Sequence, residues 1–272
     1  MSRKSETLYA SPLVTVRDVV CTAGCGNGRH EEQCQAASLA FVRSGTFVRR
    51  DRMGRHVADA TRVVFFDPAE PYMVDHPVPG GDRCTLLIFD EATLREAVRH
   101  ARGEPQRLFV RSTLAGSAAM HLEHRRLLAA ARTGNAVEVE ETALHLLQLS
   151  TSGEDAGSSL RGAAINRAAA LAADTQVLIA RSFTERVTLD ALSRTLGVSP
   201  FRLCRAFRQA TGGTLHQHLT CLRLSAALEQ LPRYRERLTD LALDLGFSSH
   251  SHFTQAFRAR FGRAPSAHLQ SA

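Results

Sequence analysis

The chain has 272 residues, 44% of them hydrophobic, which suits one large or two ordinary globular domains. No apolar run reaches the roughly 18 residues of a membrane span, and the N-terminal segment lacks a signal-peptide core, so we expect a cytoplasmic protein. The formal net charge of +7 is uneven: residues 161–272 carry 15 arginines and 7 acidic residues, whereas residues 1–160 carry a net charge of −1. An arginine excess confined to one part of the chain predicts a polyanion-binding domain there.

The first predicted elements are short strands. Segments rich in valine, phenylalanine, isoleucine and threonine, separated by turns with glycine and proline, lie at 13–20, 38–50, 61–66 and 84–89. Several short strands at this spacing predict a β-barrel or a β-sandwich. Helices are then predicted at 90–102, where Asp90 is the N-cap, and at 114–133 and 136–150. The two longer helices suit either a core layer or a dimer interface.

A polar segment rich in glycine and serine at 151–162 predicts an interdomain linker. It separates an N-terminal domain over 9–150 from a helical C-terminal domain over 163–272. In the second domain we expect a helix at about 165–183, a long helix at 214–231 and a short helix after Pro265.

The C-terminal domain contains one local pattern twice, at 188–212 and 237–262. Each copy has a short apolar-periodic helix, a glycine, a turn with serine, and a second helix that carries Ala-Phe-Arg before a final glycine. This is the pattern of a helix-turn-helix module. Two such modules can place two helices in two major grooves on one face of DNA.

In the first copy, Leu203, Ala206 and Phe207 are spaced to face the core, and Ser199 is placed to cap the second helix. Residues that read bases must lie on the opposite, outward face. The predicted DNA contacts are therefore Phe201, Arg202, Cys204, Arg205 and Arg208. We assign Arg205 to base edges and Arg208 to phosphate, because guanidinium can fork onto guanine or pair with phosphate. Arg202 suits either role.

In the second copy, the inward residues are Phe253, Ala256, Phe257 and Phe261. The predicted DNA contacts are His250, Ser251, His252, Thr254, Gln255 and Arg258. Gln255 occupies the repeat position of Arg205 and suits adenine, so the two half-sites should differ. Arg258 repeats the phosphate contact. No metal pair is expected from His250 and His252, because residues at i and i+2 face different sides of a helix.

The C-terminal domain resembles the AraC/XylS family of transcription regulators. The matching residues are Leu192, Gly197, Ser199, Leu203, Phe207, Gly212, Leu222, Arg223, Leu224, Ala226, Ala227, Leu241, Ala242, Gly246, Phe247, Phe253, Phe257, Gly262 and Pro265. Ser193 and Gln255 depart from the family, which usually has alanine and commonly arginine there. The resemblance implies a seven-helix domain that binds two adjacent major grooves. The implied partners are double-stranded DNA, a second copy of the chain in a homodimer, and RNA polymerase, with no membrane.

In this family a cupin-type sensor barrel often precedes the DNA-binding domain, and segment 13–89 resembles one. The expected fold class is therefore α+β: an N-terminal cupin-like β-barrel with appended helices, and a C-terminal all-α double helix-turn-helix domain. We predict zinc at Cys21, Cys34, His76 and Cys84, with Cys25 and His30 as further candidates, because zinc prefers thiolate and imidazole ligands. Some regulators of this type carry a similar pattern with histidine at the position of Cys34.

Other roles for this domain stay open. The thiols could sense oxidants or electrophiles, or they could be inert core residues, which would leave the barrel to bind an organic effector. An alternative from another class is a cupin-type metalloenzyme fused to a DNA-binding domain, with His30, Glu32 and His76 as its ligands. An architectural DNA-binding protein would show little sequence preference. The double module favours a signal-controlled regulator that is not an enzyme.

Overall fold

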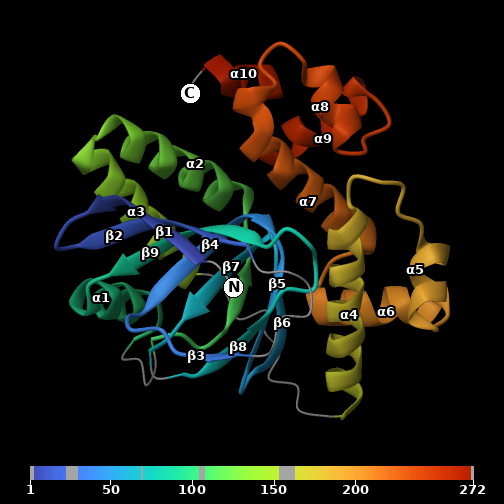
Figure 1. Cartoon of the computed structure of the whole chain (residues 1–272), viewed down its shortest axis with the longest axis horizontal. Helices are drawn as coiled ribbons and strands as arrows, with labels where there is room; N and C mark the ends of the chain where they lie inside the picture. The colour runs from blue at the N-terminus through green and yellow to red at the C-terminus, as the bar shows by residue number, and fades with distance from the viewer. Residues whose placement is uncertain (1–2, 23–29, 69, 104–107, 153–162, 271–272) are drawn as a thin grey trace. The chain divides into compact units, whose positions relative to one another are not determined.

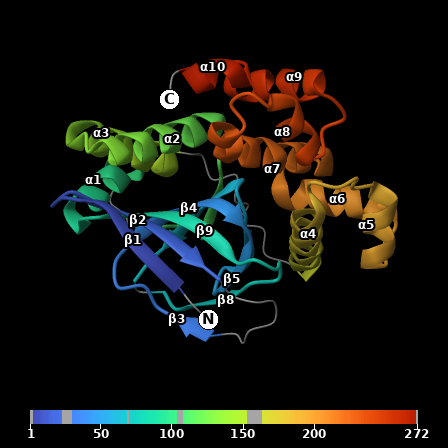
Figure 2. The ribbon, with the colours of Figure 1, turned by 45° about the horizontal axis from the view of Figure 1, so that its top comes forward.

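The chain divides into two units, residues 1–155 and 156–272, whose elements are labelled in Figures 1 and 2. The computed structural model describes residues 3–22, 30–68, 70–103, 108–152 and 163–270. The first unit is rich in strands and the second is helical, which confirms the α+β class. The predicted linker falls almost entirely on 153–162, outside the described residues.

Antiparallel strands of the first unit form two sheets (Figure 2). The larger has the order β1-β2-β9-β4-β7-β10, with β1 (Arg3–Ala10), β2 (Val14–Cys21), β9 (Asp82–Phe89), β4 (Ser38–Gly45), β7 (Arg62–Phe66) and β10 (Thr113–Ala115). The smaller has the order β3-β8-β5-β6, with β3 (His30–Glu32), β8 (Tyr72–Asp75), β5 (Phe47–Asp51) and β6 (Gly54–Ala58). In the described ranges no strand pair joins the sheets, so the predicted barrel is not closed.

The larger sheet is buried on both faces. On one face, Phe41 and Leu87 pack with Leu127 and Leu146, which lie on α2 (Ala118–Thr133) and α3 (Ala136–Thr151). On the other face, residues of β4, β7 and β9 pack against β5 and β6 of the smaller sheet. Burial on both faces explains why β4 begins with a continuous run of buried residues, where a half-exposed strand would alternate.

Some elements differ from the sequence-based expectations. The strand predicted at 38–50 is two strands, because Gly45 adopts a positive φ of 76° and its backbone lies against Gly81, where a Cβ would collide. The helix predicted from 114 begins at Ala118 with Ser117 as its N-cap, since Thr113–Ala115 pair with β7. The helix α1 (Glu91–Arg102) starts after Asp90, as predicted.

The second unit contains the predicted helices. They are α4 (Ala163–Ser182), α5 (Leu189–Leu196), α6 (Pro200–Thr211), α7 (Leu215–Gln230), α8 (Leu238–Asp244), α9 (His250–Phe261) and α10 (Pro265–Gln270), with a 3-10 turn at Leu231–Arg233. Side chains of Thr188, Ser199, Thr214 and Ser249 cap the first turns of α5, α6, α7 and α9. Across the described parts of both units, no helix is long and apolar enough to span a bilayer.

The aromatic core of this unit lies where the spacing predicts it. Leu203, Phe207, Phe253 and Phe257 are fully buried or nearly so. Leu189 is an exception among the leucines of α5, because its exposed fraction is 38%. It is the first residue of its helix and lines an open groove beside α6.

Candidate functional site

The recognition helix of the first module is α6. Gly197 adopts the left-handed conformation (φ 63°) that the turn requires, and the Ser199 hydroxyl accepts a hydrogen bond from the backbone N–H of Arg202 at 3.3 Å. Because Leu203 and Phe207 anchor the inner face, the opposite face points to solvent. The exposed side chains there are Phe201, Arg202, Cys204, Arg205 and Arg208. The predicted contacts of the first module therefore share one accessible face.

The second recognition helix, α9, is anchored in the same way by Phe253 and Phe257. Its side chains His250, Ser251, His252, Gln255 and Arg258 are exposed, and Thr254 is half-buried. The imidazole of His252 lies 3.1 Å from the Ser248 hydroxyl and packs edge-on against Phe247, at 5.5 Å between ring centroids. His252 is thus positioned by its own module, whereas Gln255 and Arg258 extend freely.

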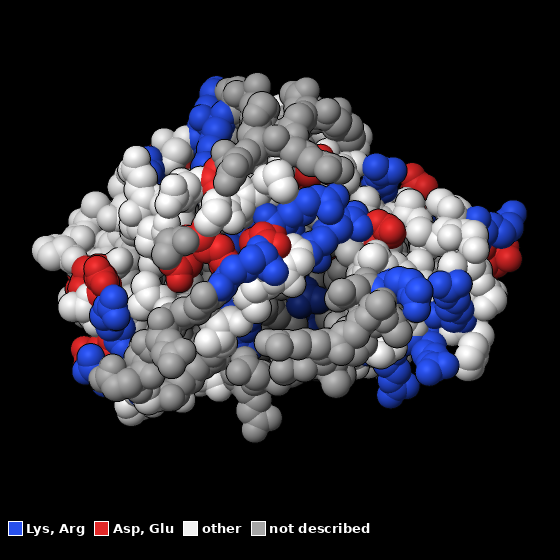
Figure 3. Space-filling view, turned by 90° about the horizontal axis from the view of Figure 1, so that it is seen from below, with Lys and Arg blue, Asp and Glu red and all other residues white. Residues whose placement is uncertain are grey.

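Arginine charge on these helices faces solvent. Among the residues that the structure describes, Arg202, Arg205, Arg208 and Arg258 have no carboxylate partner. Figure 3 shows several basic side chains on the part of the helical unit that holds α5 and α6. Unpaired arginines on helix faces are what contact with a phosphate backbone requires.

Arg223 on α7 links the two modules, a role that sequence reasoning missed. Its guanidinium donates to the backbone oxygens of Phe183 (2.6 Å) and Glu185 (2.7 Å), just before the first module. A third N–H donates to the backbone oxygen of Gly246 (2.6 Å), in the turn of the second module, and the guanidinium also lies over the Phe247 ring at 5.8 Å. The sequence feature that could have indicated this role is a single arginine in the apolar stretch of the helix that connects the two modules.

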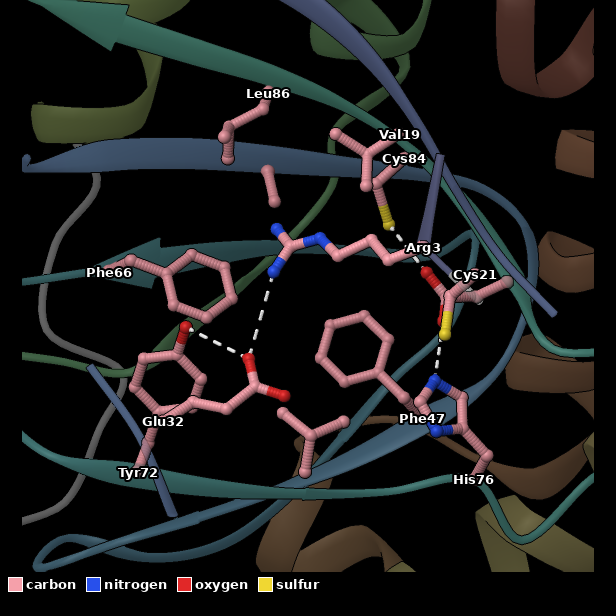
Figure 4. A pocket seen from close by; sticks show the side chains of 13 residues that line it. Arg3, Val19, Cys21, Glu32, Phe47, Phe66, Tyr72, His76, Cys84 and Leu86 are labelled. Atoms are coloured by element: carbon pink, nitrogen blue, oxygen red, sulfur yellow. Dashed lines mark hydrogen bonds and ion pairs between the residues drawn. The ribbon is translucent and has the colours of Figure 1, made fainter. Parts of the chain in front are cut away.

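A small cavity of about 70 Å³ lies between the sheets of the first unit (Figure 4). At one end, the His76 imidazole lies 2.7 Å from a carboxylate oxygen of Asp82, and the Cys84 thiol donates to the other oxygen at 3.2 Å. One ligand atom each of Cys21, His76 and Asp82 lie within 4.8 Å of one another, and all three side chains are buried. These donors come from β2, β9 and the segment after β8.

This cluster fits a zinc ion. Ligand atoms around one tetrahedral zinc lie roughly 3.3–3.8 Å apart, so a small adjustment closes the group. Strand register supplies the arrangement: Cys21 pairs with Asp82 and Val19 with Cys84, which places both thiols on the same face of neighbouring strands. Burial, together with the charge of Asp82, raises the pKa of the Cys84 thiol well above its ordinary value. A thiol binds metal only as the thiolate, so a zinc ion at this site would have to displace the proton of Cys84.

Two of the four predicted ligands, Cys21 and His76, lie in this group together with Asp82. Cys84 lies beside the group, where its thiol donates to Asp82. Asp82 was missed, because only the strand pairing places it opposite Cys21. Cys34 is not in the group: it lies half-buried in the loop after β3, where burial raises the pKa of its thiol and the nearby charges are those of Arg49 and Asp67. Cys25 lies outside the described residues, as does the side chain of His30.

The far end of the cavity is lined by a second group of polar side chains. Arg3 and Glu32 form an ion pair at 3.7 Å across the two sheets, and the Tyr72 hydroxyl donates to Glu32 at 3.4 Å. Burial and this carboxylate raise the pKa of Tyr72 to about 12. The enzyme alternative requires Glu32 to lie beside His76. Glu32 instead pairs with Arg3, and it is absent from the group that contains His76.

Comparisons with known proteins concern the second unit. A family model described as a helix-turn-helix domain matches residues 192–271. The chain is 34% identical over 80 residues to the regulatory protein SoxS of Salmonella typhimurium, covering 29% of this chain and 75% of that protein. It is 29% identical over 87 residues to the bifunctional transcriptional activator/DNA repair enzyme AdaA of Bacillus subtilis, covering 32% of this chain and 41% of that protein. The aligned part therefore spans less than half of AdaA.

A crystal structure of ToxT from Vibrio cholerae covers 99% of this chain and 97% of its own, at 10% identity and a TM-score of 0.37. A likeness this weak carries no conclusion about fold or ligand. The assignment of the chain to a protein family thus depends on the sequence matches of the double module.

Proposed function

The chain belongs to the AraC/XylS family of transcription regulators, and from this premise we propose that α6 and α9 read two adjacent major grooves under the control of the first unit. The observation that carries the proposal is the pair of outward, arginine-bearing helices whose relative position Arg223 fixes. Because phosphate contacts dominate such binding, its affinity falls steeply with salt. The target, chromosomal DNA, places the protein in the cytoplasm.

For the first unit we propose a cupin-like sensor that holds zinc. The ligands are Cys21, His76 and Cys84, and Asp82 takes the place that the sequence analysis gave to Cys34. A signal can act only if it has different affinities for two states of the protein. A metal ion that joins β2, β9 and the segment after β8 would bind the state in which these segments lie together more tightly than a state in which they are apart. A homodimer and a contact with RNA polymerase belong to the same proposal.

We do not propose an enzyme. A metal-dependent oxygenase of the cupin type needs two histidines and a carboxylate with open positions. Here Glu32 is held by Arg3 and Tyr72, and the buried donors beside His76 include thiols. A thiol-based redox sensor stays the second candidate, because Cys21 and Cys84 lie on one face of neighbouring strands.

The assignment of Arg205 is testable by substitution. Arg205→Ala is expected to weaken binding to the preferred site by about 1–3 kcal/mol and to relax one base position, because a bidentate contact to guanine is lost. Binding to a randomised duplex pool, followed by sequencing, measures both effects. Arg233→Ala, at an exposed arginine outside both recognition helices, serves as the control. Equal weakening on every sequence would show that Arg205 contacts phosphate instead.

Metal content tests the sensor site. Full-length protein purified without chelator is expected to contain about one zinc per chain by mass spectrometry, since the buried donors suit one tetrahedral ion. His76→Ala and Cys84→Ala should remove it, and Asp82→Asn should weaken its retention against a chelator. Cys204→Ser, at an exposed thiol of the other unit, is the matched control. Protein without metal and with freely reactive Cys21 and Cys84 would contradict the site and favour the redox sensor.

A further inference from the structure

A second cavity lies in the helical unit, and its apolar wall has no part in DNA reading. Its volume is about 360 Å³, in the range of small-ligand pockets, which is about 300–1,000 Å³. It opens among α4, α5, α6 and α7. The apolar part of its wall consists of Ile179, Val187, Leu189, Leu192, Leu215 and Leu219.

The side chains that line this groove include one fixed cation, Arg208. Arg208 and Cys204 reach it from α6, and His216 reaches it from α7; all three are exposed. No carboxylate pairs with Arg208 in the described part of the chain, and no acidic side chain lines the groove there. The nearest acid on α5, Asp190, pairs with Arg194 at 2.8 Å.

We propose that this groove binds a small apolar monocarboxylate. The carboxylate would pair with the planar guanidinium of Arg208, which presents two parallel N–H donors, and the hydrocarbon body would lie against the leucines. Burial of that body removes apolar surface of both partners from water and drives binding. A single fixed cation matches one negative charge, and the apolar wall disfavours polar dianions such as phosphate esters.

Occupation of the groove also controls DNA binding, since Arg208 is the proposed phosphate contact of the first module. A carboxylate paired with Arg208 neutralises the positive charge that this side chain would offer to a DNA phosphate. Ligand and DNA therefore weaken each other by the same factor, as linkage requires. This consequence depends on the proposed function, whereas ligand binding itself does not. It gives the helical unit a second input, separate from the metal site.

Cys204 offers a reporter inside the groove, so occupancy can be measured without DNA. Full-length protein is treated with a maleimide, and modification of each cysteine is followed by peptide mass spectrometry. Saturating 4-phenylbutyrate is expected to slow modification of Cys204 by about tenfold or more and to leave Cys221, which does not line the groove, unchanged. The matched neutral probe, 4-phenyl-1-butanol, should protect about tenfold more weakly because it lacks the charge-assisted pair.

Three variants locate the site. Arg208→Gln should weaken the carboxylate by about tenfold and remove its advantage over the alcohol. Leu189→Gln, at a side chain that is already 38% exposed and so tolerant of change, should weaken both probes and leave DNA binding intact. Arg233→Gln should change neither. Circular dichroism shows whether each variant is folded.

The proposal is overturned if 4-phenylbutyrate gives no protection, or protects no better than the alcohol. A Cys204 that is unreactive in the ligand-free chain would also overturn it, because another segment would then fill the groove. A titration with the mapped DNA site separates ligand binding in the groove from its effect on DNA binding. Weaker DNA binding with the carboxylate supports the linkage, and unchanged DNA affinity overturns it. If the chain selects no DNA sequence, the proposed function fails, while the labelling result still decides the groove.

Discussion

Replacing Arg223 by methionine is expected to lower affinity for a complete two-groove DNA site by about 100-fold or more, because simultaneous binding by two linked modules is lost. The guanidinium ties the segment before α5 to the turn before α9 through three backbone oxygens. Methionine keeps the aliphatic part of the side chain but donates no hydrogen bond. The two recognition helices then no longer share a fixed spacing, and binding one groove no longer positions the other helix.

Fluorescence anisotropy with a complete site and with a single half-site measures this effect. The half-site affinity should change little, since each module keeps its own caps and aromatic core. Arg233→Met, at an exposed arginine on the 3-10 turn, is the matched control. Equal losses on both DNAs would show that Arg223 supports a module and does not set their spacing.

Gly246→Ala provides an independent test of the same link. Gly246 has a φ of 78°, and a Cβ there would collide with the backbone oxygen of Thr184 and crowd the guanidinium of Arg223. It should reproduce the loss on the complete site without removing any charge. A variant that binds the complete site normally would contradict the proposed link.

Arg49→Met is expected to destabilise the first unit by about 3–5 kcal/mol, the usual effect of removing one partner of a buried ion pair. The side chain of Arg49 is 0% exposed. Its Nε lies 2.9 Å from Asp51 and its Nη2 lies 3.6 Å from Glu70. The guanidinium carbon lies 5.0 Å from the ring centroid of Phe66 and 5.0 Å from that of Tyr72. Methionine leaves the Asp51 carboxylate buried without this partner. Urea unfolding followed by tyrosine fluorescence measures the change.

The same variant should alter acid stability. Burial alone would raise the pKa of Asp51, but the hydrogen bond and charge of His56 and the charge of Arg49 outweigh it and lower the pKa to about 2. A carboxyl whose pKa is lower in the folded state stabilises the fold above its unfolded pKa and loses this contribution as the pH falls toward 2. Arg49→Met should therefore unfold at a higher pH than the parent protein.

Arg52→Met is the matched control, because Arg52 also pairs with Glu70 but is about half exposed. Exposed ion pairs contribute about 0–1 kcal/mol, so this variant should unfold almost like the parent. If Arg49→Met costs no more than Arg52→Met, the buried arginine is replaceable by apolar packing, as happens with some buried ion pairs.

The helical unit could be predicted because local signals fix it. The cap Ser199, the glycine at 197 and the spacing of Leu203 and Phe207 act within a few residues of one another. These elements therefore follow from neighbouring residues alone. The recognition face was predicted for the same reason, as the outward remainder of a helix with a known inner face.

The cavity between the two sheets depends on pairing between distant strands, which no local signal encodes. Asp82 joins Cys21 only through the register of β2 and β9, and the link through Arg223 depends on how α7 packs against two loops. The strand β1 was missed because its sequence is polar on both faces and lacks alternation. Its identity as a strand comes from its neighbour and not from its own side chains.

That strand has a consequence for solubility. Among the described residues β1 pairs with β2 alone, so its other backbone edge is the end of the larger sheet. An open edge invites pairing with another chain, and charged side chains such as Arg3, Lys4 and Glu6 discourage it. The opposite edge, β10, is only three residues long. Truncation after Ala10 would uncover β2, whose alternating apolar residues make a better template for aggregation. The polar strand β1 thus shields its apolar neighbour β2 from pairing with another chain.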